Sequence, residues 1–237
     1  MKESTPDPKS APDGPSDDVV EWLRTAERGG FLGFVAHEMR NPLSTAMWSA
    51  ELLVRLSPED RGGARGEKLS GMCLRTLTRL RLLLEDFFLV ERLAIRGLPL
   101  KREDVALAGA LDLARGRAGV EATLPPLPDL TVSADRSLLD RALEGLIAVA
   151  GRESPVTLDL ALERGSVEVR IAGASPAPDV LSTPTKATPS DPTGRALALL
   201  VARAVAEAHG GTLRLEGDAF ILALPLEEQQ RAPGGEP

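Results

Sequence analysis

The sequence predicts an α+β fold in which a long helical hairpin precedes a sandwich of helices and strands. Residues 18–96 carry apolar side chains spaced by three and four, the period of an amphipathic helix, with a break near residues 57–66. Residues 97–226 instead hold short alternating apolar and polar runs among shorter helical segments. The ends, residues 1–17 and 227–237, are rich in proline, glycine and charged residues, and we expect a disordered leader and tail there.

The hairpin is expected from two periodic segments on either side of a break. The first helix is predicted over residues 18–56, with its apolar or small positions at Leu32, Val35, Met39, Pro42/Leu43, Ala46, Ala50 and Leu53. The second is predicted over residues 67–95, with a stripe of Leu69, Cys73, Leu77, Leu80, Leu84 and Phe87. One hairpin cannot cover both stripes, so we expect two copies to pair into a dimeric four-helix bundle.

The second half is predicted to be an α/β sandwich with helices on one face of its sheet. Strands are expected at residues 156–162, 167–171, 212–216 and 219–224, and helices at 137–150 and 196–208. No repeated βαβ rhythm is present, which favours the α+β class. Residues 174–193 are expected to form a long loop, either a functional lid or a disordered segment.

Composition narrows the possible partners and location. The net charge is −7, the aromatic fraction is 3% and tyrosine is absent, so nucleic acid is not an expected partner. A single cysteine, Cys73, excludes an internal disulfide framework and a cysteine-rich zinc site. We find neither an apolar run long enough to span a bilayer nor a secretory signal, and we therefore expect a cytoplasmic protein that contacts no membrane.

One segment of the first helix carries the residues of a phosphoryl-transfer site. His37 falls two places past the core position of Val35, so we expect its imidazole to face solvent as a nucleophile toward phosphorus. Glu38 follows directly and can act as its base. Asn41 lies one turn further on, where its amide can position a water that attacks phosphohistidine.

The run from His37 to Leu43 resembles the phosphoacceptor box of sensor histidine kinases, His-Glu-x-x-Asn-Pro-Leu. The resemblance implies a dimerisation and phosphotransfer domain over residues 20–96. In that family a receiver domain docks beside the histidine and presents an aspartate. The matching partner-binding candidates are Arg40, Ser44 and Trp48, the last a possible aromatic anchor that could instead pack on the second helix or on the C-terminal domain.

Residues 98–226 resemble the ATP-binding domain of the same kinases, through residues 133–139 and 205–213, but they lack its nucleotide-binding groups. The resemblance aligns Val149 with the family's Mg²⁺-binding asparagine, and valine offers no oxygen ligand. Asn41 is the only asparagine in the chain. The other degenerate positions are Gly173 and Ser175 in place of the adenine-binding Asp-x-Gly motif, and Gly194, Ala196 and Ala198 in place of the phosphate loop. We therefore predict no cofactor and no metal.

These observations predict a phosphorelay protein of a two-component system, which carries a phosphoryl group on His37 and exchanges it with receiver aspartates. It resembles bacterial histidine phosphotransferases that have a kinase-like fold and no ATP binding. One alternative is an active histidine kinase that autophosphorylates from ATP and Mg²⁺ through a divergent nucleotide site. A second alternative is a non-catalytic regulator that binds a kinase or a receiver.

Overall fold

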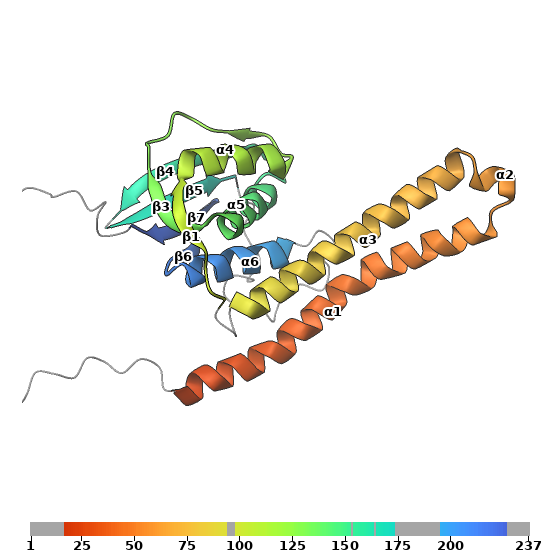
Figure 1. The fold of residues 1–237 in the computed structure, drawn as a ribbon, viewed down its shortest axis with the longest axis horizontal. Helices are drawn as coiled ribbons and strands as arrows, with labels where there is room; N and C mark the ends of the chain where they lie inside the picture. The colour runs from red at the N-terminus through yellow and green to blue at the C-terminus, as the bar shows by residue number, and fades with distance from the viewer. Residues whose placement is uncertain (1–16, 94–97, 153, 164, 174–194, 227–237) are drawn as a thin grey trace, which may run out of the picture.

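The computed structural model describes residues 17–93, 98–152, 154–163, 165–173 and 195–226. Its first part is an antiparallel hairpin of two long helices, α1 (Asp17–Arg55) and α3 (Ala64–Glu91), joined by the short helix α2 (Pro58–Arg61), as Figure 1 shows. The predicted hairpin is confirmed. None of the described helices combines the length and apolar character that crossing a bilayer requires.

The hairpin turn is fixed by side chains that satisfy free backbone groups. The Ser57 hydroxyl accepts a hydrogen bond from the Asp60 amide and caps α2. The Arg61 guanidinium donates to the carbonyls of Val54 and Leu56, at the end of α1, with N···O distances of 3.0 and 3.1 Å. A side chain at Gly66 would collide with the carbonyl of Arg61, so this close approach requires glycine.

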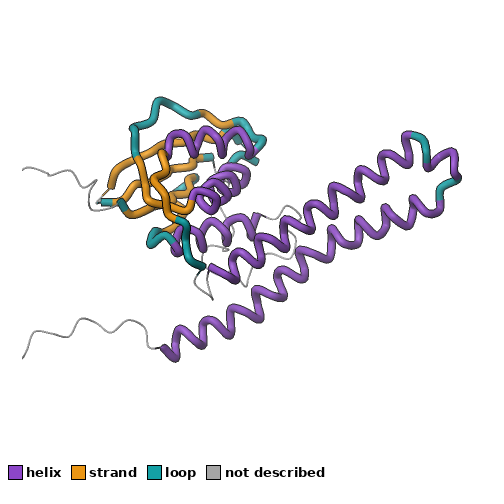
Figure 2. Tube along the Cα trace, in the orientation of Figure 1, coloured by secondary structure: helices purple, strands orange, loops and turns teal. Residues whose placement is uncertain are grey.

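The second part is a sandwich of three helices with a five-stranded sheet and a two-stranded sheet (Figure 2). The larger sheet has the order β2-β4-β5-β7-β6, and β1 pairs with β3. The elements are β1 (Arg102–Ala106), α4 (Leu107–Ala118), β2 (Ala122–Thr123), β3 (Thr131–Asp135), α5 (Arg136–Ala150), β4 (Val156–Glu163), β5 (Ser166–Ala172), α6 (Arg195–Ala208), β6 (Thr212–Glu216) and β7 (Ala219–Pro225).

The predicted helices and strands of this part are present, but β1, α4, β2 and β3 were not predicted. The strand β1 reads Arg-Glu-Asp-Val-Ala and buries only Val105, so it lacks an alternating pattern. The helix α4 contains Gly109 and Gly116, which weaken a helical signal. The predicted loop at 174–193 lies outside the described residues.

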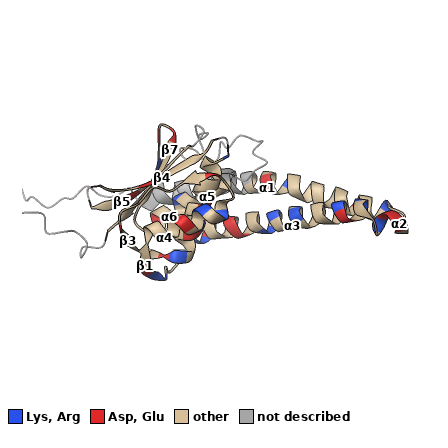
Figure 3. Ribbon diagram, turned by 90° about the horizontal axis from the view of Figure 1, so that it is seen from above, with Lys and Arg blue, Asp and Glu red and all other residues tan. Residues whose placement is uncertain are grey.

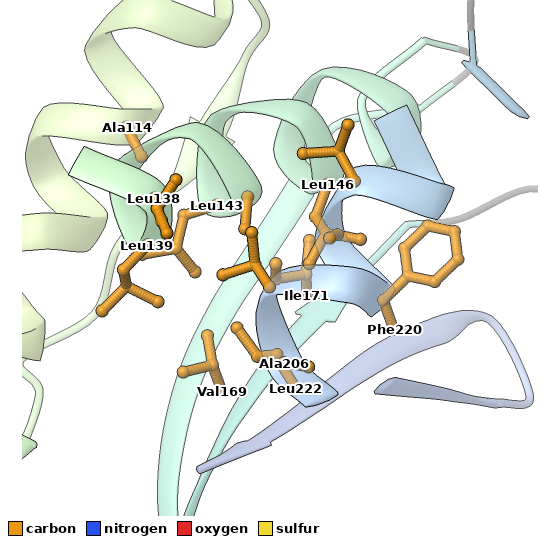
Figure 4. Close-up of a cluster of buried hydrophobic side chains, with 14 of the residues drawn as sticks. Ala114, Leu138, Leu139, Leu143, Leu146, Val169, Ile171, Ala206, Phe220 and Leu222 are labelled. Atoms are coloured by element: carbon orange, nitrogen blue, oxygen red, sulfur yellow. The ribbon is translucent and has the colours of Figure 1, made fainter. Parts of the chain in front are cut away.

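The core lies between the large sheet and the helices on one of its faces. Leu139, Leu143 and Leu146 of α5 are buried against side chains of β5 and β7 (Figure 4). On β5, buried Val167, Val169 and Ile171 alternate with half-buried polar residues. Those polar residues point to the other face, where Glu168 pairs with Arg214. The predicted sandwich with helices on one face is confirmed.

The hairpin is joined to the sandwich through the base of α3. Leu83, Val90 and Leu93 are buried in the same cluster as the sandwich core, and α3 contacts α6. Asp86 Oδ1 of α3 accepts a hydrogen bond from Arg141 Nε of α5 at 2.7 Å, and Arg141 Nη2 lies 2.6 Å from the same oxygen in an ion pair. Burial raises the pKa of Asp86, although the Arg141 guanidinium opposes this shift.

Buried His209 ties the end of α6 to the start of α5. Its Nε2 accepts a hydrogen bond from the amide of Asp135 at 2.9 Å, and its Nδ1 lies 2.7 Å from the carbonyl oxygen of Val205. Nδ1 therefore carries the proton and the ring is neutral. Burial lowers the pKa of His209 from its ordinary value of 6.5.

The free energy of unfolding is expected to fall as the pH drops below the ordinary histidine pKa of 6.5. Below this pH the unfolded chain binds a proton at His209 that the folded chain does not bind. The contribution of neutral His209 to the free energy of unfolding is therefore complete above pH 6.5, and it is lost as the pH falls through the lower pKa of the folded state. In His209→Gln this contribution disappears. Urea unfolding of both proteins at about pH 7.5 and about pH 5.5 measures the difference. Equal losses in the two proteins would contradict the assignment.

Candidate functional site

The candidate phosphoacceptor lies in the middle of α1. His37 is half-buried, whereas Asn41 and Ser44 are exposed and Trp48 is 56% exposed. With spacings of four, three and four residues, these four side chains share one face of the helix. The expectation that His37 faces solvent is therefore met only in part, because its flank is covered within the single chain.

Glu38 is 7% exposed and lies about 100° around α1 from His37, on the side that meets α3. It lines an open groove of about 340 Å³ between the two helices. The remaining lining residues are Asn41, Pro42 and Thr45 from α1 and Arg75, Thr76 and Arg79 from α3. The structure thus brings Glu38 and Asn41 together in this groove. His37 is not one of the lining residues, but it directly precedes Glu38 on α1.

Small side chains let the two helices approach closely just below the histidine. Ala46 is 4% exposed and Ser49 is fully buried, and the Cys73 thiol of α3 lies 3.7 Å from the Ala46 carbonyl oxygen. The Ser49 hydroxyl donates back to the Thr45 carbonyl at 2.7 Å. Pro42 has no amide proton, so the Glu38 carbonyl loses its usual helical partner at the groove.

Sequence reasoning missed the contribution of α3 to this site. Arg75 and Arg79 are one turn apart and face α1 across the groove. Within the part of the chain that the structure describes, neither guanidinium forms a hydrogen bond or an ion pair. The available signal was the i, i+4 arginine pair between apolar positions of the predicted second helix.

The opposite side of the hairpin is apolar and exposed. At 100° per residue, the side chains of one stripe on α1 and one on α3 turn away from the groove toward a common side. These residues are 37–75% exposed: Leu43, Met47, Val54, Leu74, Leu77, Leu84 and Phe88. We call this surface the apolar face. Leu77 and Leu84, predicted for the core stripe of the second helix, lie on it.

The positions that the sequence predicts to be a degenerate nucleotide site are only partly described. Val149 is half-buried on α5, and a Cβ added at Gly145 of the same helix would lie 3.4 Å from Ala198 Cβ on α6. Gly173 has a φ of 116°, its amide donates to the Asp218 carbonyl, and its carbonyl accepts from Ser154. Ser175, Gly194 and the Ala196 side chain lie outside the described residues. Within the described ranges, no three His, Cys, Asp or Glu residues gather as a metal site.

Comparison with known families identifies the hairpin. Residues 27–94 match the His Kinase A (phospho-acceptor) domain. They form a HisKA domain. The predicted resemblance is confirmed over this range, which includes His37, Glu38, Asn41 and the lining residues from α3. The comparison with curated proteins finds no significant match.

Two solved structures share the arrangement of a helical hairpin and a sandwich. Acinetobacter baumannii histidine kinase AdeS superimposes with a TM-score of 0.61 at 19% identity, over 81% of this chain and 98% of that chain. Full-length ShkA, crystallised with AMPPNP, gives a TM-score of 0.51 at 21% identity, over 86% of this chain and 44% of that chain. At these identities the comparison establishes the fold.

Proposed function

We propose that the chain is a phosphorelay protein in which His37 of the HisKA domain exchanges a phosphoryl group with receiver-domain aspartates. The observation that carries the proposal is the family match over residues 27–94, which contains His37 in an intact His-Glu-x-x-Asn-Pro-Leu sequence. A pure scaffold needs neither a nucleophile nor its neighbouring carboxylate. The non-catalytic regulator is therefore the weaker alternative.

The transfer requires a nucleophile, a proton acceptor and a leaving carboxylate. The imidazole nitrogen that carries no proton attacks the phosphorus of an aspartyl phosphate, and the bond from phosphorus to the aspartate oxygen breaks with its electron pair leaving on the carboxylate. The other ring nitrogen becomes positively charged, and buried Glu38 accepts its proton or stabilises the charge. The reverse sequence delivers the phosphoryl group to a second aspartate.

Loss of the phosphoryl group to water needs a positioned water molecule. Asn41 is exposed and lines the groove, and its side-chain amide can orient a water toward phosphohistidine. Arg40, Ser44 and Trp48 are all exposed and are our candidates for contact with the receiver. Among them Trp48 presents the largest apolar surface, which suits an interface anchor.

Three features of the sandwich speak against an ATP and Mg²⁺ site, and they support the proposal of phosphotransfer over autophosphorylation. Val149 offers no oxygen to a hard cation at the position that the kinase resemblance assigns to the metal ligand. Direct packing of Gly145 on Ala198 brings α5 and α6 together beside that position. The backbone of Gly173, aligned with the adenine-binding motif, is already engaged by Asp218 and Ser154.

We also propose that the apolar face mediates homodimerisation. A monomer rarely exposes a contiguous apolar patch of this kind without a partner. Pairing two hairpins through this face completes a four-helix bundle, because each copy supplies two helices. The groove and His37 then remain accessible on the outside of the bundle.

The phosphotransfer proposal predicts that labelled phosphate moves from a receiver aspartate to His37. Purified receiver domains from the same organism, labelled with acetyl phosphate, are mixed with the wild-type protein and with His37→Gln. We expect acid-labile label on the wild type and none on the variant, because glutamine has no nucleophilic ring nitrogen. Unchanged circular dichroism and dimerisation of the variant provide the control. Label on neither protein would contradict the proposal.

The dimer proposal predicts that charges on the apolar face separate the two copies. In Leu74→Glu/Leu77→Glu, two carboxylates from each copy meet in the bundle core, where burial of unpaired charge is costly. Sedimentation analysis is expected to give a dimer for the wild type and a monomer for this variant. Leu162→Glu on β4, 59% exposed on the sandwich, is the control and is expected to stay dimeric. A monomeric wild type at micromolar concentration would overturn the proposal.

A further inference from the structure

We propose that Arg75 and Arg79 form an anion-binding pair that holds the carboxylate-rich phosphorylation site of the partner against His37. Arg65 and Lys68 extend this pair into a basic row that steers the partner toward the groove. The inference rests on the proposed function, because it concerns the same transfer and names residues of α3 as positioning residues for it. None of these four residues was among the sequence-predicted site residues.

The four cations form a row on one side of α3. At 100° per residue, Arg65, Lys68, Arg75 and Arg79 fall within an arc of about 80°. Arg65, Lys68 and Arg75 are exposed and Arg79 is half-buried. Figure 3 shows basic residues recurring along α3. The chain as a whole has a net charge of −7, so this row is a local concentration against the overall composition.

Two carboxylates lie near the row: Asp86 on α3 itself, and Glu38 of α1, which lines the same groove as Arg75 and Arg79. On α3, which is described throughout, Asp86 is the acidic residue on this arc, and Arg141 of the sandwich engages it at 2.6–2.7 Å. Glu67 and Glu85 point to the other side of the helix, where Glu85 pairs with Arg81. Among the described residues, none of the four cations of the row makes an ion pair or a side-chain hydrogen bond. Their charge is available to a partner.

The register of the hairpin places Arg75 and Arg79 near the phosphoacceptor, whereas Arg65 and Lys68 lie further along α3, toward the hairpin turn. The contact of Cys73 with the Ala46 carbonyl sets the antiparallel alignment, which puts Arg75 at the level of residues 44–45 and Arg79 at the level of residues 40–41. Both arginines line the groove that contains Glu38, the residue after His37. Carboxylates that flank the aspartyl phosphate of a partner approaching His37 from this side would lie over the two guanidinium groups. A planar guanidinium can donate two parallel N–H···O hydrogen bonds to the two oxygens of a carboxylate or a phosphoryl group.

The surroundings favour an acidic protein surface over nucleic acid. Glu38 lies in the groove next to the arginines, and a continuous phosphate backbone following the row would meet this carboxylate. The row is short and the chain is acidic, whereas nucleic-acid binding relies on an extended basic surface. A compact carboxylate cluster on a protein can contact Arg75 and Arg79 without reaching Glu38.

The test compares Arg75→Gln/Arg79→Gln with the wild type in transfer from receiver domains labelled on aspartate with acetyl phosphate. We expect the second-order rate constant to fall about tenfold or more and its salt dependence to weaken, because charge steers association. Arg75→Lys/Arg79→Lys keeps both positive charges but lacks the planar set of N–H donors of a guanidinium. We expect this variant to retain the salt dependence and to transfer more slowly than the wild type. Lys101→Gln/Arg136→Gln removes the same charge from exposed positions of the sandwich and is expected to transfer at the wild-type rate.

The outcomes separate this inference from the function on which it rests. No label on wild-type His37 would overturn both. Normal transfer by the wild type with an equal rate and salt dependence in Arg75→Gln/Arg79→Gln would overturn the inference alone. An equal loss in Lys101→Gln/Arg136→Gln would also overturn it, because the effect would then follow net charge. Retention of a DNA duplex by the wild type, lost in Arg75→Gln/Arg79→Gln without any change in transfer, would assign the row to nucleic acid instead.

Discussion

The close packing of α1 on α3 is the constraint on which the site depends. Ala46 and buried Ser49 allow the helices to meet at the level of Cys73. This contact sets the register that brings Arg75 and Arg79 of α3 opposite Thr45 and Asn41 of α1. It also turns the two apolar stripes toward a common side of the hairpin. One packing interaction therefore separates a polar side, with His37 at its edge, from an apolar side that is free to pair.

The helix α3 also joins the hairpin to the sandwich. The base of α3 contributes Leu83 and Val90 to the sandwich core, and Asp86 binds Arg141 of α5. A half-buried ion pair of this kind fixes orientation more than it adds stability, because desolvation offsets much of the attraction between the charges. The sandwich therefore has a fixed position at the base of the hairpin, and it is held by the same helix, α3, that carries the basic row.

The sequence predicted the elements whose periodicity is strong and missed those without it. The hairpin, the strand pairs β4-β5 and β6-β7, and the helices α5 and α6 all followed from apolar spacing. Charged β1 and glycine-containing α4 gave no such signal, because tertiary packing rather than local pattern holds them. His37, Glu38 and Asn41 could be predicted as one motif. Arg75 and Arg79 could not, since their relation to it depends on the register between two helices distant in sequence.

In the proposed function, the phosphoryl group on His37 comes from a partner aspartate and not from ATP. The most direct measurement offers the wild-type protein Mg²⁺ with ATP carrying one phosphorus isotope on its γ-phosphate, together with a phosphorylated receiver carrying another. The isotope on His37 then identifies the donor. We predict the receiver's isotope alone. The isotope of ATP on His37 would mean that the chain is a working kinase and that Val149 and Gly173 do not prevent ATP binding.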